Sequence, residues 1–240
     1  MIEPMAVQAK QDDRHFAEIV FRDQQLCIDP RGCLYWPQER LLVVSDLHLE
    51  KGSSFAMRRN QFLPPYDTQA TLELLALCID DWRPETVLSL GDSFHDLNAS
   101  LRLPQSYRLA LQQLMAGREW LWVCGNHDPQ PPKDLGGTFC SEIFIGALNF
   151  IHEPGVDFRH GEIAGHLHPS AKIRRRGKTV RRRCVAGDQN RLIMPAFGTF
   201  TGGLNIKDEA YKGLFDKTHL RAWMLSNSEV YEIPDKQLVF

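Results

Sequence analysis

The stretch Leu41-Leu42-Val43-Val44-Ser45-Asp46-Leu47-His48 decides the fold, because it places metal-binding side chains directly after an apolar run. Four consecutive aliphatic residues without polar alternation are typical of a strand buried on both faces of a sheet. Asp46 and His48 follow at positions i and i+2, which point the same way in extended backbone. We therefore expect both side chains to reach one ion. Alone, the triplet also fits a capping aspartate followed by a surface histidine.

The same arrangement, a candidate ligand after an apolar run, recurs four more times along the chain. The further motifs are Gly91-Asp92, Gly125-Asn126-His127-Asp128, His152, and Gly165-His166-Leu167-His168. Taken singly, most of them fit ordinary turns or structural histidines. Because the carboxyl ends of successive strands can meet at one edge of a sheet, we expect the ligands to converge on one site.

The ligand candidates are four histidines, two aspartates and one asparagine, without a cysteine. Mixed nitrogen and oxygen ligands suit Mn²⁺, Fe or Zn²⁺ better than Ca²⁺ or a cysteine-bound structural zinc. A single carboxylate, here Asp92, can bridge two cations. A site with two such ions is typical of phosphoester chemistry, in which a metal-activated hydroxide attacks phosphorus in line.

His127 follows the amide ligand candidate Asn126, so we expect it to lie beside the metals without binding them. Asp128 could accept a hydrogen bond from the His127 ring and fix its orientation. The alternative for this string is a turn before Pro129. His95, three residues after the second motif, fits either a substrate contact or a surface histidine.

The first half of the chain alternates apolar runs with helical patterns, whereas the second half is richer in strands. The spacing predicts helices over 68–80, with Asp67 or Thr68 as the N-cap, and over 105–115. Residues 1–14 have the composition of a flexible polar tail. We therefore expect one α/β (α+β) domain over 15–240, built from two packed mixed sheets flanked by helices.

Basic residues are concentrated in one segment, although the net charge is only −2. Residues 172–183 contain eight Lys or Arg and no acid, which leaves 20 basic against 30 acidic residues elsewhere. Gly177-Lys178 predicts a hairpin turn between two basic strands. Since phosphate contacts supply most sequence-independent affinity for nucleic acid, the hairpin could be a DNA track. The alternative is a solvated charged hairpin. Candidate contacts are Arg174, Arg175, Arg176, and, less directly, Arg58 and Arg59.

The six cysteines form no CxxC pair and several lie in apolar runs, which favours reduced, buried thiols. No apolar run approaches the roughly 20 residues that a membrane span needs. We therefore expect a cytoplasmic protein without a membrane partner.

With these residues identified, the chain resembles the calcineurin-like metallophosphoesterase superfamily. Its motif series D-x-H, G-D, G-N-H-[DE], H and G-H-x-H is present in order. Five stretches further resemble the bacterial DNA-ligase-associated metallophosphoesterases, which are described as DNA-damage-response endonucleases. These stretches are Leu34–Pro37, Asp46–Leu49, Gly91–Asp96, Gly165–Pro169 and Pro195–Asn205, and the similarity covers roughly residues 25–206.

The resemblance implies a four-layer αββα sandwich with two divalent metal ions, Mn²⁺ in the first place and Fe or Zn²⁺ as alternatives. Carried over by position, Asp46, His48 and His168 would hold the first metal, Asn126, His152 and His166 the second, and Asp92 would bridge them. His127 would protonate the leaving oxygen or stabilise the transition state, and Asp128 would orient the His127 ring. His152 lacks the glycine that often precedes this histidine in the superfamily, so its assignment departs from the pattern.

The function that follows is hydrolysis of DNA phosphodiesters in DNA repair. By resemblance the partners would include a DNA ligase, a helicase and a nuclease, and association into a homodimer stays open. The competing functions are a phosphodiesterase for cyclic or small nucleotides, a protein phosphatase, and a non-catalytic scaffold. A scaffold would be expected to lose ligands, and all seven candidates are present.

Overall fold

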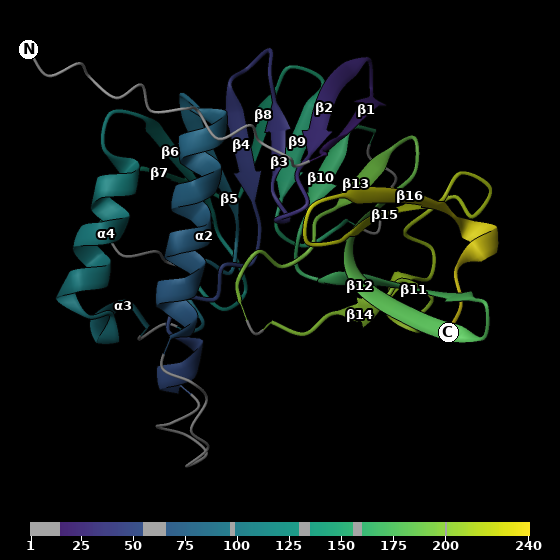
Figure 1. The fold of residues 1–240 in the computed structure, drawn as a ribbon. Coiled ribbons are helices and arrows are strands. Elements are labelled where there is room, and N and C mark those ends of the chain that lie inside the picture. The colour runs from purple at the N-terminus through teal and green to yellow at the C-terminus, as the bar shows by residue number, and fades with distance from the viewer. Residues whose placement is uncertain (1–14, 55–65, 97–98, 130–134, 156–159, 200) are drawn as a thin grey trace, which may run out of the picture.

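Two β-sheets pack face to face in the computed structural model (Figure 1). The structure describes residues 15–54, 66–96, 99–129, 135–155, 160–199 and 201–240. The N-terminal segment 1–14, for which a flexible tail is predicted, therefore lies outside the described residues, as do Arg58 and Arg59.

The first sheet has the strand order β1-β2-β3-β4-β5-β6-β7. Its strands are β1 (Ala17–Phe21), β2 (Gln24–Ile28), β3 (Leu34–Trp36), β4 (Leu41–Val44), β5 (Thr86–Leu90), β6 (Glu119–Val123) and β7 (Thr138–Cys140). Strands β1 to β4 form an antiparallel meander, whereas β4 to β7 run parallel. The carboxyl ends of β4, β5 and β6 therefore lie side by side at one edge.

The second sheet has the order β14-β11-β12-β13-β10-β9-β8, and β15 and β16 join it through β12. Its strands are β8 (Glu142–Ile145), β9 (Leu148–Ile151), β10 (Glu162–Ala164), β11 (Pro169–Arg175), β12 (Lys178–Gly187), β13 (Arg191–Ile193), β14 (Leu204–Asn205), β15 (Arg221–Leu225) and β16 (Val230–Pro234). Because β9 and β10 are parallel neighbours, their carboxyl ends also adjoin.

Strand β4 is buried on both faces, as its continuous apolar run predicts. Val43 packs with Leu88 of β5 and Phe150 of β9 in the core between the sheets. Leu42 and Val44 point the other way, into a second core beneath the helices. This alternation follows from the two-residue period of a strand.

Helices α2 (Asp67–Trp82), α3 (Ala99–Arg102) and α4 (Gln105–Met115) lie on the outer face of the first sheet (Figure 1). The helices predicted over 68–80 and 105–115 are confirmed, but the predicted N-cap of α2 is wrong. Tyr66 occupies that position, and Asp67 instead accepts a hydrogen bond from the Gly52 amide at 2.7 Å. No helix in the described ranges is long and apolar enough to cross a membrane.

The outer face of the second sheet is covered by a loop with little helix. Ile206, Tyr211, Phe215 and Leu220 form a third core against β11, β12 and β15. Within this layer the 3-10 turns η1 (Glu209–Tyr211) and η2 (Asp235–Gln237) take the place of long helices. The two-sheet sandwich of the expected αββα fold is thus present, with its fourth layer reduced to short turns and loop.

Candidate metal centre

The five ligand motifs follow the carboxyl ends of β4, β5, β6, β9 and β10, which belong to both sheets. Backbone hydrogen bonds join the motifs directly. The His48 amide donates to the Asp92 carbonyl at 2.9 Å, and the Gly165 amide donates to the His152 carbonyl at 2.9 Å. The His166 amide donates to Oδ2 of Asp46 at 3.0 Å, across the two sheets. The predicted convergence on one site is therefore what the fold produces.

Asp46, His48 and His168 form a first cluster whose ligand atoms lie close enough to share one ion. Nε2 of His168 is 3.0 Å from Oδ1 of Asp46 and 3.3 Å from Nε2 of His48. Asp46 and His48 are buried, whereas His168 is partly exposed. These are the three residues that the resemblance implies for the first metal.

Asp92, His152 and His166 form a second cluster. Nε2 of His152 lies 3.5 Å from Oδ1 of Asp92, 3.3 Å from Nδ1 of His166 and 2.9 Å from Oδ1 of Asn126. The other ring nitrogen of His152 lies 2.8 Å from the Leu90 carbonyl, which fixes the ring with Nε2 toward the cluster. His152 therefore occupies its expected place without a preceding glycine.

The donor set fits two divalent cations. Oδ1 of Asp46 is buried, and the nitrogen that lies 3.0 Å from it is Nε2 of His168, which is itself a ligand candidate. Two pairs of imidazole nitrogens, His48 with His168 and His152 with His166, face one another at 3.3 Å. A cation between such lone pairs would satisfy them. Nitrogen and oxygen ligands without thiolate match Mn²⁺, Fe or Zn²⁺.

Five of the seven ligand candidates have left-handed backbone, which corrects the extended geometry expected from the sequence. The φ angles are 53° for Asp46, 45° for His48, 46° for Asp92, 69° for His166 and 47° for His168. Residues other than glycine pay a steric cost in this region. The i and i+2 side chains meet because the chain curls after each strand, not because the strand continues.

Gly91 shows how closely the motifs pack. Its φ is +73°, and a Cβ atom there would lie 2.4 Å from Nδ1 of His152. The glycine in the Gly-Asp motif is therefore required twice, for its backbone conformation and for the space that the His152 ring occupies.

Burial and neighbouring charges shift the pKa values of the ionisable groups in the site. Burial lowers the pKa of His48 to about 3, which leaves a neutral imidazole that can bind a cation. Burial also lowers the pKa of His152, but the hydrogen bond to Asp92 and the charge of Asp46 outweigh this and raise it to about 9. Burial raises the pKa of Asp46, but the His168 hydrogen bond and charge hold it below its usual range. Cation binding would thus compete with a proton on His152.

His127 lies beside the second cluster. Its amide donates to Oδ1 of Asp92 at 2.9 Å, its Nε2 lies 3.9 Å from Oδ2 of the same carboxylate, and its side chain is 44% exposed. The His95 ring stacks on the His127 ring, with centroids 5.5 Å apart and planes at 16°. His127 is thus close to the ligands but accessible from solvent, and His95 adjoins the same space.

Asp128 does not hold the His127 ring, contrary to the expectation from the sequence. Its Oδ2 accepts the Phe94 amide at 3.0 Å and its Oδ1 accepts the Gly125 amide at 3.1 Å. No hydrogen bond joins the two side chains, and both belong to the described residues. Burial raises the pKa of Asp128 to about 7, against the effect of these amides. Asp128 therefore fastens the second motif to the third through backbone groups.

The predicted basic hairpin is present as β11 and β12, but its turn lies one residue earlier than expected. Arg176 and Gly177 have positive φ angles between the paired residues Arg175 and Lys178, as in a type I′ turn. Arg174 is six residues along the strand from His168, or about 20 Å at the usual strand rise. Arg174 and Arg175 point to opposite faces.

A segment that we call the strap, Pro195–Thr199 with Thr201–Asn205, forms hydrogen bonds with the backbone of both first-cluster motifs. At one end, the Phe197 amide donates to the Ser45 carbonyl at 2.8 Å. At the other end, the Leu204 amide donates to the His168 carbonyl at 3.1 Å. A Cβ atom on Gly198 would lie 2.2 Å from the Leu47 carbonyl oxygen. The sequence marks this string by resemblance alone, and its positioning role comes only from these contacts.

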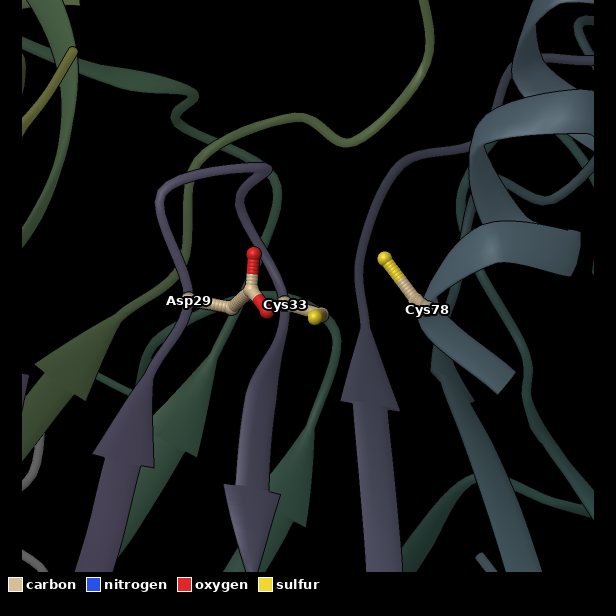
Figure 2. Close-up of side chains that lie close together, drawn as sticks. All are labelled: Asp29, Cys33 and Cys78. Atoms are coloured by element: carbon tan, nitrogen blue, oxygen red, sulfur yellow. The ribbon is translucent and has the colours of Figure 1, made fainter. Parts of the chain in front are cut away.

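A third group of potential ligands, Asp29, Cys33 and Cys78, lies near the carboxyl end of β2, the start of β3 and helix α2 (Figure 2). The Asp29 carboxylate is already saturated by Arg31 through its amide, Nε and Nη2, and by Nε1 of Trp82 at 2.8 Å. Burial raises the pKa of the Cys33 thiol well above its usual range. This group is therefore a buried polar contact, and all six cysteines are free thiols as expected.

Comparison with known proteins agrees with the geometry. The crystal structure of Pseudomonas putida nuclease MPE aligns with a TM-score of 0.70 and 26% sequence identity, covering 91% of this chain and 100% of that one. YfcE, a phosphoesterase from E. coli, aligns with a TM-score of 0.38 and 13% identity over 81% of this chain and 98% of that one. No curated protein sequence matches significantly. The sequence model of the calcineurin-like phosphoesterases matches residues 39–191, more than half of the chain, and the protein belongs to this family.

Proposed function

We propose that this protein is a phosphodiesterase with two divalent metal ions that hydrolyses DNA as an endonuclease. The observation that carries the proposal is the pair of adjoining nitrogen and oxygen clusters at the shared edge of the two sheets. Family membership supports phosphoester hydrolysis. The likeness to a bacterial nuclease over the whole length of that protein supports nucleic acid as the substrate.

The residues divide into binding and reacting groups. Asp46, His48 and His168 would hold one ion, Asn126, His152 and His166 would hold the other, and Asp92 would bridge them. Two bound cations supply Lewis-acid stabilisation of the phosphate and a low pKa for bound water. We assign them to Mn²⁺, with Fe or Zn²⁺ as the alternatives that the same ligands accept.

His127 is the group that we expect to move a proton. Its side chain is 44% exposed, and its backbone amide donates to the Asp92 carboxylate. A histidine there can donate a proton to the leaving oxygen as the bond to phosphorus breaks. His95 is proposed to support the His127 ring by stacking and to border the substrate.

The strap and the metal-site motifs resemble those of the DNA-ligase-associated metallophosphoesterases. This resemblance supports a role in DNA repair and association with a DNA ligase, a helicase and a further nuclease. The basic β11–β12 hairpin supports a polyanionic substrate over a phosphopeptide. We therefore propose that the protein acts on DNA during repair, together with these partners.

The test is an assay of metal-depleted protein reconstituted separately with Mn²⁺, Zn²⁺ or Fe²⁺. Substrates are bis-p-nitrophenyl phosphate, a cyclic nucleotide, linear single- and double-stranded DNA, and a closed circular single strand. We expect hydrolysis of the generic diester and of the circular DNA, because only an endonuclease cuts a strand without ends. Asp92→Asn is the inactive control. Turnover of the cyclic nucleotide alone would replace DNA by small nucleotides, and no turnover of any diester would refute the enzyme assignment.

A further inference from the structure

The β11–β12 hairpin has two chemically different faces. Directly opposed residues of an antiparallel pair share a face. Ser170, Lys172 and Arg174 lie opposite Arg183, Arg181 and Thr179, and together they form what we call the basic face. On the other face, Ala171 and Ile173 pack into the core that covers the second sheet. The basic face lies on the side of the hairpin opposite that apolar layer.

The basic face contacts the strap, and the strap in turn contacts the first-cluster motifs of the metal centre. Nη1 of Arg183 donates to the Ala196 carbonyl at 2.7 Å. Nε of Arg181 donates to Oγ of Ser170 at 2.9 Å, and its Nη2 donates to the Gly203 carbonyl. Gly203 precedes the residue whose amide binds the His168 carbonyl. The row of cations thus begins beside the first-cluster ligands and extends away from them.

Acidic residues in the described part of the chain do not pair with Lys172, Arg174 or Arg181 on this face. Lys172 lies directly opposite Arg181, a pairing of like charges that destabilises a sheet. Arg174 is two residues, or about 7 Å, further along the strand. None of the three forms an ion pair with any residue in the ranges that the structure describes. A polyanion on this face would relieve that repulsion.

Arg181 is the cation of the three for which the described residues supply side-chain hydrogen-bond acceptors. Its Nε and one Nη2 hydrogen are engaged by Ser170 and Gly203, which fixes the plane of the guanidinium. The Nη1 group remains able to donate. A guanidinium held in this way loses less conformational entropy when it binds a phosphate.

We propose that Lys172, Arg174 and Arg181 bind the phosphodiester backbone of the DNA strand that enters the metal centre, with Arg181 as the contact nearest the metals. This proposal rests on the proposed function. It narrows the set of residues that contact DNA, because it excludes Arg175 and Arg176. Arg175 faces the other side and Arg176 occupies the turn. Phosphate contacts of this kind hold the strand without reading its sequence.

The experiment compares two double variants that remove the same charge from the same hairpin. Lys172→Ala/Arg174→Ala alters the basic face, and Arg175→Ala/Lys178→Ala alters the opposite face. Arg181 is left intact because it also ties the strap. Affinity for a labelled single-stranded oligonucleotide and for its duplex is measured in EDTA by fluorescence anisotropy, between 50 and 200 mM salt. Thermal unfolding of both variants checks that they fold.

We expect the control variant to keep wild-type affinity and salt dependence. The basic-face variant should bind more weakly, with a salt slope shallower by about 1.4 for single strands and about 1.8 for duplex, given 0.7 or 0.9 per lost phosphate contact. Over that salt range, the affinity of wild type should therefore fall about 7-fold more than that of this variant for single strands, and about 12-fold more for duplex. Equal losses in both variants, or none in either, would overturn the assignment. Failure of wild type to hydrolyse bis-p-nitrophenyl phosphate would refute the proposed function separately.

Discussion

Replacing Asp128 with alanine should unfold the protein more readily, because its carboxylate accepts two backbone amides in a buried position. The side chain lies at 4% exposure and binds Phe94 N at 3.0 Å and Gly125 N at 3.1 Å. Leaving a buried amide donor without an acceptor costs about 1–3 kcal/mol, so two such amides cost about 2–6 kcal/mol. Burial already raises the pKa of this carboxyl to about 7, and its removal relieves that desolvation. We therefore expect a loss near 3 kcal/mol.

The assay is urea and thermal unfolding in EDTA, so that lost metal binding does not add to the result. A loss of 3 kcal/mol should lower the melting temperature by about 6–12 °C for a chain of this size. The control is Asp208→Ala, which removes a single acceptor of the Ala210 amide at an exposed 3-10 turn. That change should cost about 1 kcal/mol.

The result separates two roles for Asp128. If it only oriented the His127 ring, Asp128→Ala would keep its stability and lose turnover to the same extent as His127→Ala. A stability loss no larger than that of the Asp208 variant would refute the backbone role that we infer from the structure.

Three further predictions follow from the same structure. His127→Ala should lower diester turnover by about 10²- to 10⁴-fold yet keep two metal ions per chain by elemental analysis, and loss of metal would contradict its role. Gly198→Ala should weaken Mn²⁺ binding in calorimetry, because its Cβ would meet the Leu47 carbonyl oxygen, whereas Gly202→Ala, with open space around it, should not. Burial raises the pKa of Asp29, but the hydrogen bonds and charge of Arg31 outweigh burial and lower this pKa. The ionised Asp29 carboxylate therefore stabilises the folded state above about pH 4. This stabilisation is lost as pH falls through the lower pKa of the folded state. Asp29→Asn should therefore lose less stability than wild type in urea unfolding between pH 5 and pH 3, and equal slopes would contradict this.

The ligand motifs and their positions could be predicted because each depends on a local pattern. An apolar run predicts a buried strand, and the polar residue after it then lies at the strand end. The limits of α4 were predictable for the same reason, since Pro104 and Gly117 bound a helical pattern. No such pattern predicts strands β7 and β14, because both are short and depend on a neighbour for pairing.

The sequence by itself determined which residues can bind metal and that they lie at successive strand ends. Only the tertiary structure decided how those residues are held. The left-handed turns at Asp46 and His168, the amides on Asp128, and the strap over both first-cluster motifs all depend on backbone contacts between distant segments. The two faces of the basic hairpin were likewise undecided, because alternation along a strand separates Arg174 from Arg175 but cannot say which side meets the core. That choice was made by the apolar layer that packs against Ala171 and Ile173, because burying their side chains places Lys172, Arg174 and Arg181 on the opposite face.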